Sequence, residues 1–518
     1  MLFQLNLFFD CDGFHISAMH PIPLARSTRT YIDDLPVEIM DRIMSYLPLA
    51  DRKSASLVCY RWSELAFSFC YLANVRLRLK EQEMMMKLKI VDVLQNSWRS
   101  YRNVALDFGN SGVDVVLILV ILSKFSKSIE VFGTQPLFTP WQLKEMLQRM
   151  PKLKQLTVNV ISEGECYVKP HEFPVMEDLL DIRTTDAIFD IPDMNALKLM
   201  PSVQNLSVYF QRNVTENAFT ALCSVSPQLK TLEVFADFSR SPIEMLNLQQ
   251  LDTLKLWGTN AFINNDALKQ LFMGIPLLSV LFLHVRMTTS LLEVICSHCP
   301  LLTSFGFIAD RMDQMSLCAL SKLKNLKILL IDGCLKYYMI HGCKPLPTVD
   351  TFCMYWHKKH IDLERFVKQL HYMLPNVRIL KVIGTRSKQM DNPLIHHIGR
   401  LFTKVKKLTV ADFVFPREIR SPDECFDWVA NLGNVEQLIL STMRLKNIDC
   451  LRGSDKVRKL KLEHLNYLPG NSLVLLASLF PRLKSLKINR CALITAKDIK
   501  TVQRMMPKCT MGFVERKR

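Results

Sequence analysis

The sequence predicts an α/β protein in which a short N-terminal group of helices is followed by a curved solenoid, with parallel strands on the concave side and helices on the convex side. Two patterns predict this class. Apolar residues recur at helical spacing between residues 31 and 66, and the strand motif Pro-x-Leu-x-x-Leu-x-Leu/Val recurs along most of the remaining chain. A chain of 518 residues is also too long for one hydrophobic core, so several domains or one long repeat array is expected.

Residues 1–30 show no sustained hydrophobic period and end in a stretch that contains Pro21 and Pro23. We expect a flexible leader there. The opening is apolar, but it has no basic region, and Asp10 and Asp12 interrupt it. A secretory signal peptide is therefore not expected.

Two short helices are predicted next. Pro36 suits a first helical position, and Ile39, Ile43 and Leu47 recur at i, i+4 and i+8 as one apolar stripe that Pro48 terminates. A second apolar group follows at Leu57, Val58 and Trp62. A stretch of about 36 residues buries too little apolar surface to be stable alone. We therefore expect it to need a partner.

From Leu72 onward the pattern changes to short alternating strands, and the repeat begins. It reads PKLKQLTV at Pro151 and PRLKSLKI at Pro481, and its central anchors are about 25 residues apart on average. Helix-like segments separate the strands, so each unit supplies one strand and one helix that must stack on its neighbours. The predicted anchors are Leu156, Leu179, Leu206, Leu232, Leu254, Leu281, Phe305, Leu329, Phe352, Leu380, Leu408, Leu438, Leu460 and Leu486.

The first stretch reads Leu35-Pro36-x-Glu38-Ile39 and closes on Leu57-Val58-Cys59-x-x-Trp62. It resembles an F-box, the module by which F-box proteins dock on a Skp-type adaptor. The following units resemble the leucine-rich repeats of F-box/leucine-rich-repeat proteins. After the expected leader at residues 1–30, the resemblance implies an F-box at 31–70 and a leucine-rich-repeat solenoid at 72–518.

Carried over position by position, the resemblance implies an adaptor-binding surface. The alternative is an ordinary helical hairpin packed on the rest of the chain. The residues that match the adaptor-facing positions are Leu35, Pro36, Ile39, Ile43, Leu47, Leu57, Val58 and Trp62.

Side chains between the strand anchors are expected to point out of the array, where they could hold a target. Two rows are predicted to bind substrate on the concave face, one aromatic and one basic. Loops could instead cover the aromatic row, and the basic row could be only a solvated face. The aromatic row comprises Tyr209, Phe210, Phe235, Trp257, His284, Tyr355 and Trp356, and the basic row comprises Lys381, Lys407, Lys459, Lys461, Lys487 and Arg490.

Charge is distributed unevenly along the chain. The formal net charge is +17, and residues 361–518 hold 30 basic and 14 acidic residues, which accounts for +16 of it. This polarity predicts that the final third attracts an acidic or phosphorylated part of a target.

The 15 cysteines are odd in number and scattered, which indicates reduced thiols and a cytoplasmic or nuclear protein. Cys296 and Cys299 are expected to be core residues. A group of cysteines and histidines has enough ligands for zinc, but its spacing matches no familiar zinc site. The group comprises Cys334, His341, Cys343, Cys353, His357 and His360. We therefore expect no metal, no cofactor and no catalytic residue.

The function that the resemblance implies is that of a non-catalytic substrate receptor in a Skp-cullin-F-box ubiquitin ligase. The adaptor, and through it a cullin, would bind the helical module, and the repeats would bind the protein to be ubiquitylated. Two alternatives are a scaffold on the same adaptor without a ligase role and a basic solenoid that binds nucleic acid or an acidic membrane surface. No nucleic-acid motif supports the latter, and the apolar run from Val115 to Leu122 is too short to span a membrane.

Overall fold

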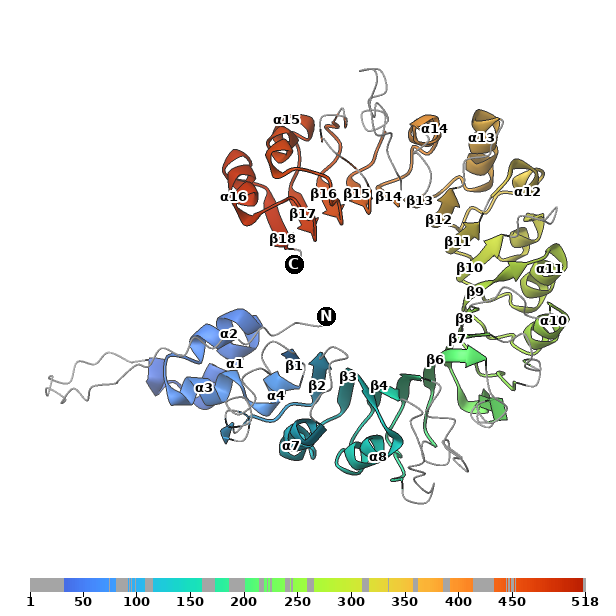
Figure 1. Cartoon of the computed structure of the whole chain (residues 1–518). Coiled ribbons are helices and arrows are strands. Elements are labelled where there is room, and N and C mark those ends of the chain that lie inside the picture. Colours follow the sequence, from blue (N-terminus) through green and yellow to red (C-terminus); the bar gives the residue numbers. More distant parts are fainter. Residues whose placement is uncertain are drawn as a thin grey trace, which may run out of the picture. The chain divides into compact units, whose positions relative to one another are not determined.

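A computed structural model shows the arrangement of the chain (Figure 1). It describes residues 32–73, 75–80, 92, 94, 96–97, 99–107, 115–160, 173–185, 201–213, 219–220, 222–223, 226–237, 243, 246–258, 265–309, 316–333, 335–356, 362–384, 392–412, 433–443, 445, 448, 451 and 453–515. The predicted leader at 1–30 lies outside these residues. The chain forms two compact units: unit 1 comprises Met1–Gln211 and Thr215–Gln228, and unit 2 comprises Arg212–Val214 and Leu229–Arg518.

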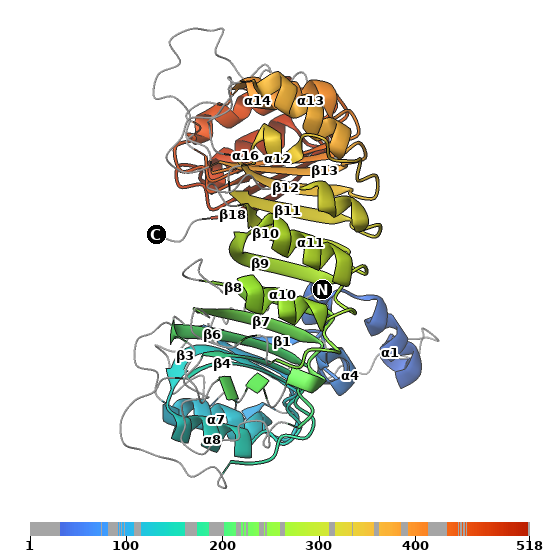
Figure 2. The same ribbon diagram turned by 90° about the vertical axis from the view of Figure 1, so that its right-hand side faces the viewer.

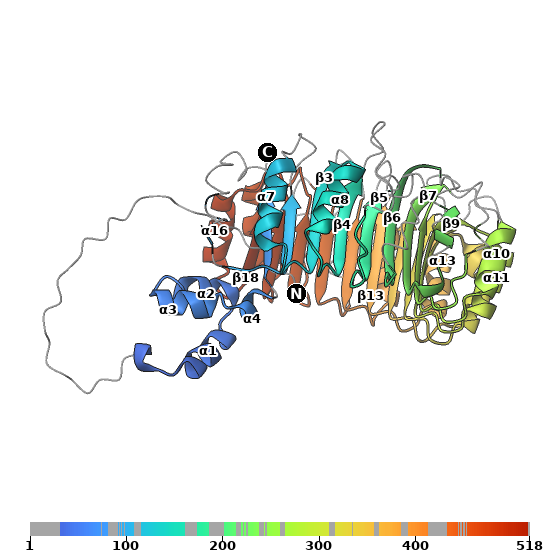
Figure 3. The same ribbon diagram turned by 90° about the horizontal axis from the view of Figure 1, so that it is seen from below.

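The N-terminal stretch forms a group of short helices, shown in blue in Figures 1 and 3. They are η1 (Ile32–Asp34), α1 (Val37–Tyr46), α2 (Leu49–Ala55), α3 (Tyr60–Ala66) and α4 (Phe69–Leu72). Pro36 stands one residue before α1 in an extended conformation rather than at the first helical position that we predicted. Pro48 separates α1 from α2 as predicted, because the residue before a proline is disfavoured in helical conformation.

The remainder of unit 1 alternates strands with helices, and helices α7 and α8 lie on the outer side of the strands (Figure 1). Neighbouring strands from β1 to β6 pair in parallel in chain order. The elements are β1 (Arg76–Lys80), β2 (Asn103–Asp107), α7 (Val115–Phe125), β3 (Val131–Phe138), α8 (Pro140–Gln148), β4 (Gln155–Val160), β5 (Asp181–Thr185), β6 (Asn205–Asn213) and η4 (Ser226–Gln228). The apolar run from Val115 is thus part of α7, and no helix among the described residues is long and apolar enough to cross a membrane.

Unit 2 continues the same pattern with strands β7 to β18, which pair in parallel in chain order, and with helices on their outer side (Figures 1 and 2). The strands are β7 (Thr231–Asp237), β8 (Thr253–Trp257), β9 (Val280–Met287), β10 (Ser304–Ala309), β11 (Ile328–Gly333), β12 (Thr351–Trp356), β13 (Ile379–Gly384), β14 (Lys407–Ala411), β15 (Gln437–Ser441), β16 (Lys459–Glu463), β17 (Ser485–Asn489) and β18 (Thr510–Val514). The helices are α10 (Asn265–Met273), α11 (Thr289–His298), η6 (Cys318–Lys322), α12 (Tyr337–Ile340), α13 (Leu363–Met373), α14 (Asn392–Leu401), η9 (Gly470–Leu475), α15 (Leu476–Leu479) and α16 (Ala496–Met505). The predicted fold class, a helical module followed by a parallel-strand solenoid, is confirmed.

The predicted anchors form the core rows. In unit 2 each anchor is in register with the anchor of the next strand, as in the pairs Leu254–Leu281 and Leu408–Leu438, and all of these side chains are buried. One anchor in unit 1 was wrong. Leu179 is buried before β5, and Ile182 is the residue in register with Leu156 and Leu206. Leu179 occupies the first leucine position of the motif, three residues before the anchor. The true anchor of β5 is an isoleucine, and for this reason the leucine motif did not identify it.

Two glycines with positive φ offer a matched test of this packing. Gly453 (φ +71) precedes β16, and a Cβ added there would overlap the backbone carbonyl of Leu479. Gly342 (φ +75) has nothing within 4 Å of that position. We expect Gly342→Ala to cost about 1–2 kcal/mol of stability from backbone strain, and Gly453→Ala to cost about 1–3 kcal/mol more from overpacking. Urea denaturation of both variants measures this difference, and equal losses would contradict the packing described around Gly453.

Candidate functional site

The helical module presents apolar side chains on its surface. Leu57 is 86% exposed, Val58 is 62% exposed and Ile39 is 45% exposed. Of the other predicted adaptor-binding residues, Pro36 is exposed, and Leu35, Ile43, Leu47 and Trp62 are half-buried. Large apolar side chains left in contact with water are unfavourable, so this surface has the character of a docking site.

A second apolar stripe on α1 explains why these residues are left outside. Met40 and Met44, one residue beyond Ile39 and Ile43, are completely buried and hold α1 in the module. We did not predict this inner stripe, although its i, i+4 spacing is visible in the sequence. The structure also adds Val37, Tyr46 and Tyr60 to the exposed apolar residues of the module.

Contacts between the helices hold the module in shape. Arg61 Nη2 donates a 2.6 Å hydrogen bond to the backbone oxygen of Leu35. The Arg52 guanidinium lies 4.7 Å from the centre of the Tyr71 ring, and the Tyr71 hydroxyl donates to the backbone oxygen of Asp41. Burial, together with the nearby Asp41, raises the pKa of Tyr71 to about 12, so this hydroxyl remains a donor at neutral pH.

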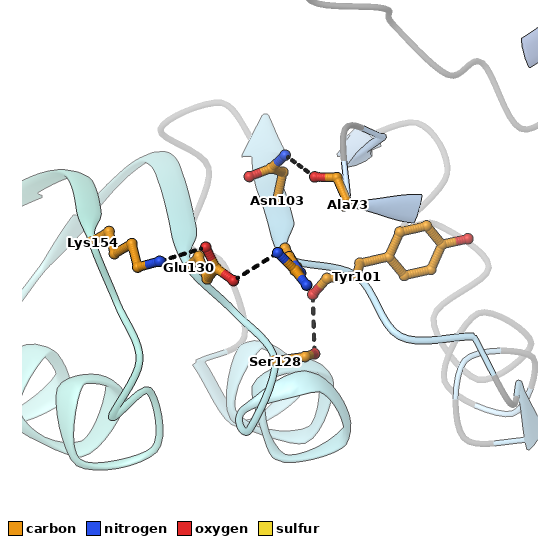
Figure 4. Close-up of polar contacts among 7 residues, drawn as sticks. Ala73, Tyr101, Asn103, Ser128, Glu130 and Lys154 are labelled. Carbon is orange, nitrogen blue, oxygen red and sulfur yellow. Dashed lines mark hydrogen bonds and ion pairs between the residues drawn. The ribbon is translucent and has the colours of Figure 1, made fainter. Parts of the chain in front are cut away.

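Contacts of Arg102 and Asn103 join the module to the first strands of unit 1, and Figure 4 shows polar contacts at this boundary, among them those of Asn103 with Ala73 and of Glu130 with Lys154. The Arg102 guanidinium lies 4.0 Å from the centre of the Phe69 ring, and its Nη1 lies 3.2 Å from Glu130 Oε1. Glu130 in turn holds Lys154 Nζ at 3.0 Å, and Asn103 Nδ2 donates a 3.0 Å hydrogen bond to the oxygen of Ala73. These contacts run from α4 to the segment before β4.

Three of the predicted aromatic residues form one stack on neighbouring strands of unit 2. The Phe235 and Trp257 rings are nearly parallel, with centroids 5.5 Å apart, and His284 lies 6.0 Å from Trp257. Trp257 Nε1 donates to Glu233 Oε1 at 3.2 Å. All three residues are half-buried.

Two predicted surface aromatics are wrong, because Phe210 is 2% exposed and Trp356 is 3% exposed. Successive residues of a strand point to opposite faces, and both pairs of neighbouring aromatic residues lie within strands, on β6 and β12. Tyr209 and Tyr355 therefore point outward, and Phe210 and Trp356 point into the core. Tyr209 is 52% exposed, and Tyr355 is half-buried. Tyr209 and Phe210 belong to unit 1, and the other residues of the aromatic row belong to unit 2.

The structure also shows an outward aromatic residue, Phe282, that we did not predict from the motif. Phe282 occupies the position between the anchors of β9, and its ring covers Gly306 on β10, where any added Cβ would overlap it. Its signal in the sequence was the unusual glycine in the middle of a strand, which indicates close approach of another group.

The predicted basic residues lie at the surface of unit 2. Lys381, Lys459, Lys487 and Arg490 are exposed, whereas Lys407 and Lys461 are half-buried. Lys461 Nζ lies 2.7 Å from Glu463 Oε1. Burial alone would raise the pKa of Glu463, but its hydrogen bonds with Lys461 and Asn489 outweigh that effect and lower the pKa. This lysine therefore adds little net charge to the row.

Some of the described cysteines are core residues, whereas Cys70 and Cys318 are exposed. Cys296 and Cys299 are buried, and burial raises the pKa of both thiols to about 12. Cys334, His357 and His360 of the weighed metal cluster lie outside the described residues. Within the described part of the chain, no group of three or more His, Cys, Asp or Glu residues is placed to hold a metal ion.

The helical module and the repeats that follow it resemble those of F-box proteins with leucine-rich repeats. The F-box-like family model matches residues 32–73, which confirms the resemblance of the module. A putative F-box/LRR-repeat protein of Arabidopsis thaliana is 26% identical over 219 residues, which cover 39% of this chain and 41% of that protein. The chain thus matches less than half the length of this curated relative.

Three solved structures are similar to the chain at low identity. A leucine-rich-repeat protein of Leptospira interrogans is 13% identical and has a TM-score of 0.32, covering 85% of this chain and 90% of its own. Rad7, in its complex with Elc1 from yeast, is 12% identical with a TM-score of 0.32, covering 93% and 98%. The leucine-rich-repeat protein LegL7 of Legionella pneumophila is 10% identical with a TM-score of 0.34, covering 61% and 96%.

The arginine contacts at the module boundary can be tested directly. Arg102→Ala removes both the stacking on Phe69 and the ion pair with Glu130, and we expect a loss of about 1–2 kcal/mol at this junction. Hydrogen exchange of the α4 amides should accelerate accordingly. The matched control is Arg149→Ala, which removes an exposed pair with Glu145 at 3.7 Å and should leave α4 unchanged. Equal exchange in both variants would mean that Arg102 does not hold the module.

Proposed function

We propose that this protein is a substrate receptor of a Skp-cullin-F-box ubiquitin ligase in the cytoplasm or nucleus. The helical module binds a Skp-type adaptor, and the repeats bind the protein to be ubiquitylated. The observation that carries the proposal is the F-box-like segment at residues 32–73, whose apolar side chains are exposed although Met40 and Met44 beneath them are buried. A surface of this kind is favourable only when a partner covers it.

On this proposal the chain accelerates ubiquitylation without catalytic residues of its own. A receptor raises the effective concentration of a target lysine near the ubiquitin-charged enzyme. The contacts of Arg99 with Phe67, at 3.7 Å, and of Arg102 with Phe69 tie the docking module to the first strands of unit 1, which supports a module that is held on the neighbouring repeats.

The target-binding part of the proposal rests on the outward face of unit 2. The stack of Phe235, Trp257 and His284 offers rigid, half-exposed aromatic area, which is enriched at protein interfaces. Exposed lysines such as Lys459 and Lys487 would attract acidic segments of a target from about 8 Å, the screening length at physiological salt.

Adaptor binding is tested by Leu57→Ala combined with Val58→Ala. Each apolar side chain that becomes buried in a complex contributes roughly 1.5–3 kcal/mol, so we expect the double variant to lose at least about a hundredfold in affinity. The two side chains are so exposed that the circular dichroism spectrum should not change. Co-precipitation and titration with a Skp-type adaptor measure the effect.

The matched control is Leu277→Ala combined with Leu301→Ala, which truncates two exposed leucines of unit 2 and should bind the adaptor normally. Undiminished adaptor binding by the Leu57 and Val58 variant would refute the proposed docking surface. A complex that holds the adaptor but captures no cullin would instead favour a scaffold without a ligase role.

Target binding is tested with proteins that proximity labelling finds on the adaptor-deficient variant, because these escape degradation. Trp257→Ala should raise the dissociation rate at every salt concentration, since it removes apolar contact area. Lys459→Glu combined with Lys487→Glu should slow association mainly at low salt, since it reverses a long-range attraction. Unchanged association rates at low salt would show that the basic row is only solvated surface.

A further inference from the structure

Two thiols lie beside each other between neighbouring repeats of unit 2. Cys318 opens η6, the short helix before β11, and Cys343 follows α12, the short helix before β12. Their Sγ atoms are 3.4 Å apart. A disulfide bond is about 2.0 Å long, so the two sulfur atoms need to approach by only about 1.4 Å to form one. Because 25 residues separate the two cysteines in sequence, no local motif marks the pair.

Backbone hydrogen bonds hold the two cysteines in place. The Leu317 amide, next to Cys318, donates a 2.9 Å hydrogen bond to the backbone oxygen of Met339 in α12. The Cys343 amide donates to the backbone oxygen of Ile340, and the Cys343 thiol lies 3.6 Å from that of Met339. The same short helix therefore fixes both sides of the pair.

The two thiols differ in their access to solvent. Cys318 is exposed, whereas Cys343 is only 3% exposed. Burial, together with the neighbouring Cys318 thiol, raises the pKa of Cys343 to about 12, so Cys343 remains protonated at neutral pH. A dissolved oxidant can thus reach Cys318 first, while Cys343 lies next to it as a second thiol. An accessible cysteine beside a resolving cysteine is the arrangement typical of redox sensors.

Other cysteines of the described chain do not share this arrangement. Cys296 and Cys299 are close in sequence, but both are buried, and the Cys299 thiol lies 3.5 Å from the backbone oxygen of Ile275. Cys70 is exposed, but no second thiol lies within hydrogen-bonding distance of it among the residues that the structure describes. Both cases offer internal controls for the reactivity of Cys318.

We propose that Cys318 and Cys343 form a site of reversible oxidation, at which hydrogen peroxide converts the two thiols into a disulfide that joins neighbouring repeats. The site goes beyond the proposed function, because it depends on neither the adaptor nor the target. It also lies apart from the aromatic and basic rows, since α12 is on the outer side of the strands (Figure 1). In a reducing compartment such a disulfide is transient and reports oxidation.

The oxidation takes two steps. The Cys318 thiolate attacks one peroxide oxygen, so that an S–O bond forms, the O–O bond breaks, and the departing hydroxide leaves as water with the proton that the thiol released. The Cys343 sulfur then attacks the Cys318 sulfur, so that the S–S bond forms, the S–O bond breaks, and hydroxide leaves as water with the Cys343 proton. In total, two thiols are oxidised, one peroxide is reduced and two water molecules form.

The disulfide restrains the two repeats that it joins. It closes a loop that contains β11 and α12, and a closed loop of this kind opposes local opening. We expect amide hydrogen exchange in α12 to slow at least about tenfold when the disulfide forms.

The test treats the reduced full chain with hydrogen peroxide, blocks the remaining thiols with N-ethylmaleimide and identifies linked peptides by mass spectrometry without reduction. Because reactivity follows exposure, the link between Cys318 and Cys343 should form at least about tenfold faster than any link between Cys296 and Cys299. Dithiothreitol should reverse it and restore the exchange rate of α12.

Three variants separate the roles of the two thiols. Cys343→Ser should stop the reaction at the sulfenic acid of Cys318, which dimedone traps. Cys318→Ser should leave Cys343 reduced, because an oxidant cannot reach it, and this substitution of an exposed residue should not disturb the fold. The matched control Cys70→Ser removes another exposed thiol and should leave the rate of linking unchanged.

The remaining results decide against the site. Failure of the link to form at a peroxide concentration that oxidises Cys70 would overturn it, and so would a link from Cys318 to any other cysteine. Slowed exchange of α12 in peroxide-treated Cys318→Ser would assign the protection to oxidation elsewhere. Unchanged exchange in the fully linked protein would show that the disulfide does not restrain the repeats.

Discussion

No repeat of this protein can bury its own apolar face, and the structure follows from that constraint. One strand and one short helix leave the anchor leucine uncovered on two sides. Parallel pairing in a common register places each anchor against the next, as in Leu254 beside Leu281, and the helices cover the outer side. Because every strand takes part, a change in one turn affects its neighbour directly, as the contact between the position of Gly453 and the backbone of Leu479 shows.

The same register decides which side chains can reach a partner. Alternation along each strand sends Tyr209 outward and Phe210 inward, although the two are adjacent in sequence. In the helical module, helical periodicity decides which side chains are exposed: Met40 and Met44 are buried, and Ile39 is exposed. The surfaces proposed for docking are thus the faces that remain after each element has packed against its own chain.

Charge illustrates the difference between composition and geometry. The final third of the chain holds nearly all of the net positive charge, yet Lys461 and Lys406 are paired with Glu463 and Glu436. The charge count of a segment therefore does not give the charge that its surface presents, because pairing is a property of the folded chain.

The sequence by itself determined the fold class, the helical module and nearly all of the anchors. These features depend on short periodic patterns, and the strand pattern recurs in each repeat. It also identified the exposed residues Leu57 and Val58, since the motif that contains them is local. The burial of Phe210 and Trp356, the cover of Phe282 over Gly306 and the approach of Cys318 to Cys343 were decided only by the tertiary structure. The physical reason is that these features join residues one or more repeats apart, and the strand lengths and register that bring them together are set by packing between neighbours.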